Sequence, residues 1–337
     1  MVLLDLIYAS LLKKRGKFDA TKARKDISEI LIKNEKIKIV PIKRYAKNKI
    51  IGTLEIIFQM LFKLMRIPKD TTIIVQYPMT GIKAFYLLSL LLSKFQTILV
   101  VHDLLSYRFT VKNVDRKQEI ISLNRMKHII VHTEAMKKRL IQDGVNVDMV
   151  PLYAFDYLLP LEQEIKKKKN AIVFAGALEK SLFLKDLNKI PNEHITFNLY
   201  GVDLPQGITT DKIHYKGAFL SDDITSIEGD WGLLWDGNSI TDCKGNFGEY
   251  LTIIASHKFS LYIACKMKVI VWEKSALAPF VKEKKIGIVI KNLFEIDHQI
   301  DRLSTDDIAI MEGNVESLSI QIRKGIMFKN AFCKIKN

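Results

Sequence analysis

The stretch "TTIIVQYPMTGIKAFYLLSLLLSKFQTILVVHDL", residues 71–104, decides the fold. Residues 71–78 and 96–104 are short, almost continuously apolar runs rich in β-branched residues, which predicts two buried strands. Residues 81–94 between them have the length and composition of a helix. A strand, a helix and a second strand in this order predict parallel strands in a sheet that helices cover on both faces.

The same alternation extends in both directions from this stretch. Strands are predicted at 2–9, 37–42, 128–133 and 147–153, and then at 171–176, 195–201, 212–218, 230–237, 268–272 and 286–290. The break between the two series is "LEQEIKKKKN", residues 161–170, whose four lysines are typical of an exposed linker. We therefore predict an α/β protein with two Rossmann-like, doubly wound domains, residues 1–158 and 171–310, joined by a linker at 159–170 and followed by a helical tail at 311–337.

Composition narrows the classes of partner. The 337 residues carry a formal net charge of +15, which favours anionic partners such as phosphates or an anionic membrane face. A nucleic-acid partner would rest on charge alone, because no recognition motif is present. The three cysteines lie far apart without C-x-x-C spacing, so neither a zinc site nor a disulfide framework is expected, and we assign no metal.

The sequence contains no targeting or spanning segment that we recognise. The N-terminal apolar run lacks a basic region ahead of it, and the longest apolar run, residues 84–93, is too short to cross a bilayer. We expect a cytoplasmic protein that can touch the inner face of the membrane.

Polar residues and glycines follow most of the predicted strands. In open α/β sheets, ligands bind outside the carboxyl ends of the strands, and two facing sheets would form a cleft there. An ordinary loop explains any one of these positions but explains several together less well. The residues are Tyr77, Pro78, Gly81, His102, Asp103, Lys180, Tyr200, Asp236 and Gly237.

A glycine-containing loop, "CKGNFGEYL" at residues 243–251, follows the fourth strand of the second domain. Glycines such as Gly248 allow the backbone to approach a ligand, and Glu249 could accept hydrogen bonds from a ribose diol. Ser256 could cap the next helix, whose first-turn amides and Lys258 would then form an anion site. The alternative is an ordinary turn.

Several common signatures are missing. The chain has no G-x-G-x-x-G at the start of a βαβ unit, no G-x-x-x-x-G-K-[ST] and no G-x-S-x-G. These absences argue against an NAD-dependent enzyme, a P-loop NTPase and an α/β-hydrolase.

Long blocks of the sequence resemble one family. Residues 231–251 and 257–290, and the blocks "FDATKARKDISEI", "VQYP", "VVHDLLSYR" and "VFAGALEK", are similar to bacterial GT-B glycosyltransferases. That group includes β-1,6-galactofuranosyltransferases of O-antigen synthesis and glucosyltransferases that modify serine-rich adhesins. The resemblance covers nearly the whole chain. It implies a GT-B fold, with a donor-binding second domain and an acceptor-binding first domain.

The resemblance also implies roles for individual residues. Tyr77, Pro78 and Gly81 would lie on the acceptor side. The donor would be a UDP-sugar, with no separate cofactor. By this resemblance its binding residues would be Thr21, Lys180, Asp236, Gly248, Glu249, His257 and Lys258. We add Tyr200 and Gly237 from the strand ends and Asn246 from the glycine-containing loop.

The expected reaction transfers a hexosyl group from the UDP-sugar to a hydroxyl of a glycan or lipid-linked glycan acceptor. We expect an inverting, metal-independent reaction in which Lys180, Lys258 and helix-end amides stabilise the departing diphosphate. Asp103 is the first candidate for the base and His102 the second, although Asp103 could instead cap a turn and orient His102. The rival interpretation is a non-catalytic partner with the same fold. We also expect a homo-oligomer.

Overall fold

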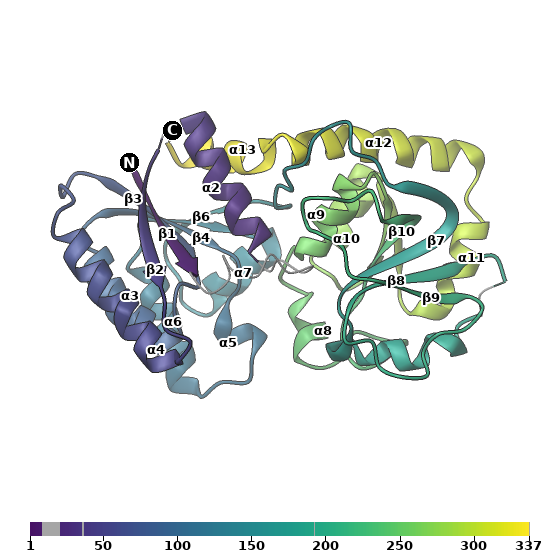
Figure 1. The fold of residues 1–337 in the computed structure, drawn as a ribbon, viewed down its shortest axis with the longest axis horizontal. Coiled ribbons are helices and arrows are strands. Elements are labelled where there is room, and N and C mark those ends of the chain that lie inside the picture. Colours follow the sequence, from purple (N-terminus) through teal and green to yellow (C-terminus); the bar gives the residue numbers. More distant parts are fainter. Residues whose placement is uncertain (9–20, 36, 192, 337) are drawn as a thin grey trace. The chain divides into compact units, whose positions relative to one another are not determined.

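The computed structural model describes residues 1–8, 21–35, 37–191 and 193–336, and its ribbon is drawn in Figure 1. The chain divides into two compact units. Of the described residues, the first unit holds 1–8, 23–152 and 328–336, and the second holds 21–22 and 153–327.

The first unit is built on a parallel sheet. Its strand order is β2-β1-β3-β4-β5-β6, and every neighbouring pair is parallel. The strands are β1 (Val2–Tyr8), β2 (Lys38–Arg44), β3 (Thr72–Tyr77), β4 (Gln96–Val101), β5 (His128–Val131) and β6 (Asp148–Pro151). From β1 the chain first adds β2 on one side, and it then returns to add β3 and the later strands on the other side of β1, so the strand order reverses between β1 and β3.

Helices connect these strands, as the crossover of parallel strands requires. They are α2 (Lys22–Glu35), α3 (Lys49–Leu64), α4 (Ile82–Leu92), α5 (Leu105–Arg108), α6 (Asn113–Asn124) and α7 (Glu134–Gln142). Helix α13 (Ile326–Lys336) also contributes to this unit from Phe328 onward, and it buries Phe328, Ala331 and Phe332.

The second unit repeats the plan with a second parallel sheet of order β12-β11-β10-β7-β8-β9. Its strands are β7 (Lys166–Ala177), β8 (Thr196–Val202), β9 (Ile213–Gly217), β10 (Glu228–Leu234), β11 (Lys268–Trp272) and β12 (Gly287–Ile290). Its helices are η1 (Leu178–Lys180), η2 (Leu182–Lys189), α8 (Asn246–Tyr250), α9 (His257–Ala264), α10 (Ala278–Lys284), η3 (Leu293–Glu295), α11 (Ile296–Asp301) and α12 (Thr305–Arg323).

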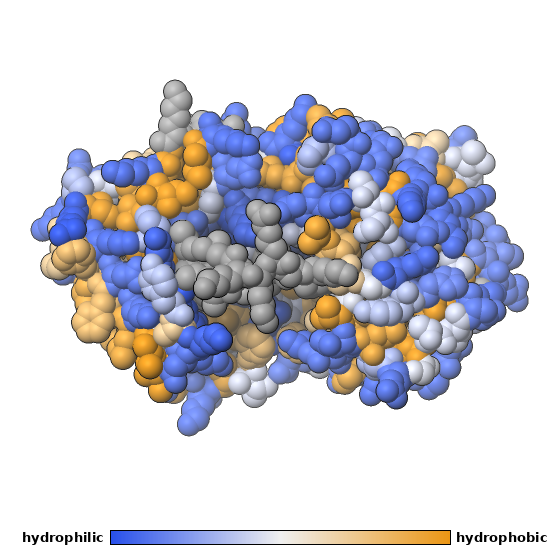
Figure 2. Space-filling view, viewed as in Figure 1, coloured by the Kyte–Doolittle hydropathy of each residue, from blue (hydrophilic) through white to orange (hydrophobic). Residues whose placement is uncertain are grey.

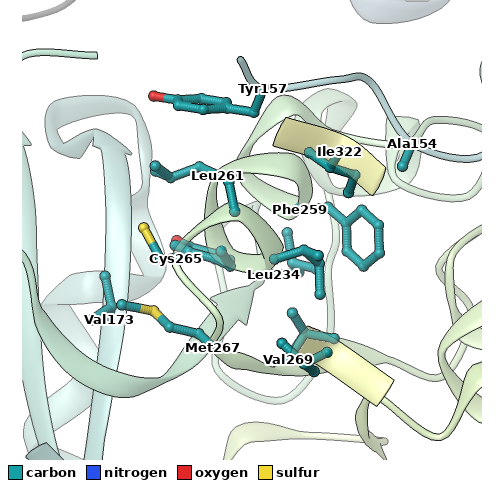
Figure 3. Packing of buried hydrophobic residues seen from close by; sticks show 14 of the residues in the cluster. Ala154, Tyr157, Val173, Leu234, Phe259, Leu261, Cys265, Met267, Val269 and Ile322 are labelled. Atoms are coloured by element: carbon teal, nitrogen blue, oxygen red, sulfur yellow. The ribbon is translucent and has the colours of Figure 1, made fainter. Parts of the chain in front are cut away.

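Both faces of the second sheet are buried. Successive residues of a strand point to opposite faces, so Val173 of β7 belongs to one apolar cluster and Phe174 to the other. Figure 3 shows the first cluster, in which Phe259 of α9 and Ile322 of α12 lie among strand residues. Tyr262 of α9 packs so closely on β10 that a Cβ at Gly232 would lie 2.2 Å from its ring. Only glycine fits there.

The lysine run differs from the sequence prediction. Residues 166–169 begin β7 and are not part of a linker, because Lys166 and Lys167 pair with Glu228 and Gly229 of β10. Their charge is balanced in place: Lys168 lies 3.3 Å from a Glu228 carboxylate oxygen. A run of lysines can therefore form a strand where some of its side chains pair with a neighbouring acid and the others are exposed to solvent.

Side-chain hydrogen bonds to the backbone shape two segments of the second unit. Residues 221–227 form turns, and residues 228–229 begin β10. In these turns the Asp223 side chain accepts hydrogen bonds from the backbone and hydroxyl of Thr225, which competes with helix formation. Helix α12 is capped by Ser304, which forms a capping box with Asp307. None of the helices in the described residues is both long and apolar enough to cross a bilayer.

Candidate active site

The second sheet offers a ligand site at the carboxyl edge of β7 and β10. From β7 the chain builds outward through β8 and β9, and it then returns to the opposite side of β7 to form β10. In open α/β sheets, ligands bind outside the carboxyl ends of the strands at such a reversal. Gly176 is the penultimate residue of β7, and Asp236 and Gly237 lie two and three residues after the end of β10 at Leu234.

Lys258 and Asp236 meet at this edge. The Lys258 Nζ atom lies 3.6 Å from Asp236 Oδ2, and both side chains are about one-fifth exposed. The same ammonium lies 4.3 Å from the centre of the Phe174 ring, and a Cβ at Gly176 would lie 3.7 Å from it. A cation held between a ring, a carboxylate and bare backbone is positioned to meet an anion that approaches the strand ends.

The loop after Asp236 is tightly folded. Gly237 has a φ of 102°, and a side chain there would meet the carbonyl oxygen of Lys244 at 2.3 Å. Gly248 is similarly pressed against the carbonyl of Cys243. We predicted that Gly248 allows the backbone to approach a ligand. The structure gives a second reason for glycine at this position, because a side chain would collide with the backbone of the loop itself.

The polar side chains of the loop remain accessible. Asn246 and Glu249 are exposed in α8, and Gly245 before them has a φ of 84°. Burial in the same loop raises the pKa of the Cys243 thiol to about 12, so this cysteine is an inert core residue at neutral pH.

The N-terminus of α9 carries two buried polar atoms without a partner among the described residues, Ser256 Oγ and His257 Nε2. Ser256 occupies the predicted cap position, but its side chain makes no capping hydrogen bond. Burial lowers the pKa of His257 to about 4, so the ring is neutral at pH 7. Its centre lies 5.1 Å from that of the Tyr157 ring. The Ser256 hydroxyl, the first-turn backbone N–H groups and, in its Nε2–H tautomer, the His257 ring are a suitable set of donors for an anionic ligand oxygen.

Three other predicted donor residues lie differently. Lys180 is exposed at the end of η1, and Thr21 is half-buried in the turn immediately before α2. Tyr200 is buried in the core, where its hydroxyl accepts a hydrogen bond from the backbone N–H of Glu228 at 2.8 Å. The hydroxyl of Tyr200 thus holds β8 to the start of β10, and the ligand contact of Tyr200 stays a prediction.

The first sheet has its own polar cluster at the reversal between β1 and β3. The His102 Nε2 atom lies 2.7 Å from Gln76 Oε1, and the Gln76 amide donates to Ser28 Oγ of α2 at 3.0 Å. Arg24 of the same helix donates to the carbonyls of Gln76 at 3.0 Å and Pro78 at 2.7 Å. The imidazole of His102 is thus oriented by a buried amide that helix α2 fixes.

Asp103 is paired with a cation. Arg108 donates to Asp103 Oδ2 at 2.5 Å, and both side chains are half-buried. Burial raises the pKa of Asp103 above its ordinary value, and the charge and hydrogen bond of Arg108 offset part of that rise. A carboxylate with a raised pKa suits a general base, while the ion pair with Arg108 restrains its orientation.

The predicted acceptor residues divide into two kinds. Tyr77 is fully buried, and its hydroxyl donates to Glu119, which also accepts from the backbone of Leu105 and Ser106. Tyr77 therefore supports the loop after β4 and presents no surface to an acceptor. Pro78 is half-buried, whereas Gly81 is exposed, and a side chain there would meet no atom within 4 Å.

Sequence reasoning missed the residues that hold the first cluster together. Arg24, Ser28 and Gln76 lie on a helix and inside a strand, and their polar character alone gave no indication of mutual contact. The i to i+4 spacing of Arg24 and Ser28, which places both on one face of α2, was the available signal.

Solved structures share the fold. Sucrose-phosphate synthase from Thermosynechococcus elongatus matches with a TM-score of 0.53 at 12% identity, over 90% of this chain and 84% of that one. A UDP-forming α,α-trehalose-phosphate synthase from Burkholderia xenovorans matches with a TM-score of 0.52 at 9% identity, over 88% of this chain and 80% of that one. These similarities confirm the predicted two-domain α/β fold of the GT-B type.

Two curated glycosyltransferases are similar in sequence. The β-1,6-galactofuranosyltransferase WbbI of Escherichia coli (strain K12) is 28% identical over 92% of this chain and 92% of its own length. Glucosyltransferase 3 of Streptococcus gordonii is 24% identical over 69% of this chain and 68% of its own length.

The fold and these relatives define the class: the chain is a glycosyltransferase with a GT-B fold. The models of the N-terminal and C-terminal domains described as "Glucosyltransferase 3-like" match residues 9–153 and 172–335. The chain belongs to this glucosyltransferase 3-like family, as the resemblance implied.

Proposed function

We propose that this glycosyltransferase moves a hexosyl group, galactofuranosyl or glucosyl, from a UDP-sugar to a hydroxyl of a glycan acceptor in the synthesis of a bacterial surface polysaccharide or glycoprotein. The similarity to a galactofuranosyltransferase along 92% of both chains carries the proposal. The UDP-forming enzyme among the solved structures with this fold is consistent with a UDP-linked donor.

In this proposal the second unit holds the diphosphate. Lys258 supplies a positive charge 3.6 Å from Asp236, and the N-terminus of α9 supplies backbone donors together with Ser256 Oγ and His257 Nε2. Glu249, exposed at the end of α8, accepts from the ribose hydroxyls. As the bond to the sugar breaks, negative charge grows on the departing diphosphate, and these fixed donors stabilise it.

The first unit supplies the base for an inverting transfer. Asp103 would accept the proton of the acceptor hydroxyl, and Arg108 would hold the carboxylate in position. Acceptor recognition near Gly81, contact with an anionic membrane and assembly of a homo-oligomer are further parts of the proposal.

A donor screen tests the proposed function. Release of UDP is measured with UDP-galactofuranose, UDP-glucose and other UDP-hexoses, each with N-acetylglucosamine-bearing and lipid-linked acceptors. We expect acceptor-dependent UDP release with one donor, and NMR of the product should show an inverted anomeric centre. Binding of UDP without turnover of any pair would instead favour the non-catalytic partner.

The same assay addresses the metal. No D-x-D-like acidic pair lies among the residues that we predict beside the cleft, which motivates the proposal of a metal-independent reaction. Turnover in excess EDTA should equal turnover with magnesium. A loss in EDTA that Mg²⁺ or Mn²⁺ restores would refute metal independence and leave the transferase activity standing.

A further inference from the structure

Helix α3 of the first unit is apolar on two faces. Its inner face buries Gly52, Ile56, Met60 and Leu64, and α3 packs there against β2. Its outer face exposes seven large apolar side chains. These are Ile50 (73% exposed), Ile51 (54%), Leu54 (48%), Phe58 (68%), Leu61 (36%), Phe62 (51%) and, directly after the helix, Met65 (76%). We call these seven residues the outer stripe.

The outer stripe is continuous. With about 3.6 residues per turn, its members fall within roughly 120° of the helix circumference. The polar residues beside it are turned to the end of β2: Glu55 accepts from the backbone of Tyr45 at 2.9 Å, and Gln59 accepts from the backbone of Lys43 at 2.9 Å. No charged side chain of α3 therefore interrupts the stripe.

The apolar surface extends to the neighbouring helix. Helix α4 packs against α3 and exposes Leu87 (56%) and Leu90 (46%). In the view of Figure 2, hydrophobic colouring gathers over the part of the molecule where Figure 1 draws α3 and α4. A cluster of this kind is larger than the scattered apolar side chains of an ordinary surface, and it marks an interaction site.

Basic residues border the outer stripe. Lys43, Lys47, Lys49, Arg66 and Lys69 are all exposed, whereas residues 43–69 contain a single acid, Glu55. The Arg66 guanidinium lies 3.7 Å from the centre of the Phe62 ring, so its charge is held at the edge of the apolar surface.

We propose that the outer stripe, with Leu87 and Leu90, is a docking surface for a bilayer that contains anionic phospholipid. An amphipathic helix with aromatic and aliphatic residues on one face and Lys or Arg beside it inserts at the level of the head groups, where both kinds of group are satisfied. A second copy of this chain fits less well, because a symmetric contact would bring the two basic borders together. The proposal does not depend on the donor, since vesicle binding is measured without turnover.

Vesicle co-sedimentation tests the proposal. The full chain should pellet with phosphatidylcholine vesicles that contain phosphatidylglycerol and much less with phosphatidylcholine alone. Leu54→Asp with Phe58→Asp should weaken binding at least about a hundredfold, because two apolar side chains no longer enter the bilayer. The control is Ile310→Asp with Ile320→Asp on α12, which replaces two exposed apolar residues (49% and 38%) outside the outer stripe and should leave binding unchanged.

The basic border has a separate signature. Lys47→Gln, Lys49→Gln and Lys69→Gln together should weaken binding to anionic vesicles roughly fivefold per residue and leave binding to neutral vesicles unchanged. Wild-type protein that ignores anionic vesicles would overturn the proposal. If the Leu54 and Phe58 variant also halved the mass in analytical ultracentrifugation without lipid, the stripe would instead be an interface between copies.

Discussion

Replacing Lys258 with methionine should selectively weaken the binding of UDP. Methionine keeps an apolar stem against the Phe174 ring, 4.3 Å from the wild-type ammonium, so packing is retained while the charge is lost. Two unit charges about 4 Å apart interact by about 4 kcal/mol in a medium of effective dielectric constant 20. Asp236, 3.6 Å away, and partial solvent exposure already neutralise part of that charge.

The net contribution is therefore that of a charged hydrogen bond, about 1.5–3 kcal/mol, which corresponds to a rise in the Kd of UDP of about 10- to 150-fold. Uridine lacks the diphosphate, so its Kd should change little. Isothermal titration calorimetry of both ligands into wild type and Lys258→Met separates the two effects. Lys244→Met is the matched control, because Lys244 lies in the neighbouring loop but is exposed and paired with Asp242 at 2.7 Å.

Two results would refute this reasoning. An unchanged Kd for UDP in Lys258→Met would mean that the ammonium does not contact the diphosphate. An equal loss for UDP and uridine would mean that the substitution disturbs the whole site and that charge is not the cause.

Three further predictions concern other residues. Asp103→Asn should lower kcat by roughly 10²–10⁴-fold and leave the affinity for UDP unchanged. In the wild type, kcat should fall on acidification with an apparent pKa above the ordinary range of an aspartate, because burial raises the pKa of Asp103. Burial lowers the pKa of His257 to about 4, so the folded state favours the neutral ring. The contribution of His257 to the free energy of unfolding is therefore fully present above about pH 6.5, the pKa in the unfolded chain, and is lost as the pH falls toward 4. Urea denaturation at several pH values should show this slope, and His257→Gln should remove it. Arg323→Met should lower the Tm by several degrees in calorimetry. The buried Arg323 donates to the carbonyls of Ala264, Pro160 and Gln163, and these carbonyls would lose their hydrogen-bond partner. Lys324→Met, at an exposed position, is the control.

The alternation of apolar runs was sufficient to locate the strands. Buried parallel strands are apolar on both faces, so β3, β4 and β11 appear as uninterrupted runs whose ends are sharply marked by polar residues. The start of β7 could not be found in this way. Lys166–Lys169 lie at an edge of the apolar core, and only the position of Glu228 on the neighbouring strand explains how they pair.

The site was predicted in part for a similar reason. Order along the sequence indicated that Asp236 and Lys258 follow a strand and begin a helix, and the structure brings them together. Order alone could not distinguish a side chain that points outward from one that points into the core. Tyr77 and Tyr200 both stand at strand ends, yet each hydroxyl is used by a neighbouring segment of the fold.

The membership of α13 in the first unit has a consequence for biosynthesis. Because this unit combines residues from before residue 152 with residues from 328 onward, it is a discontinuous domain. During translation the ribosome must produce the entire second unit before Phe328, Ala331 and Phe332 can take their buried places. Until then, the apolar surface of the first unit that α13 covers in the complete chain is exposed to solvent. A fragment that ends at residue 152 would expose this surface permanently.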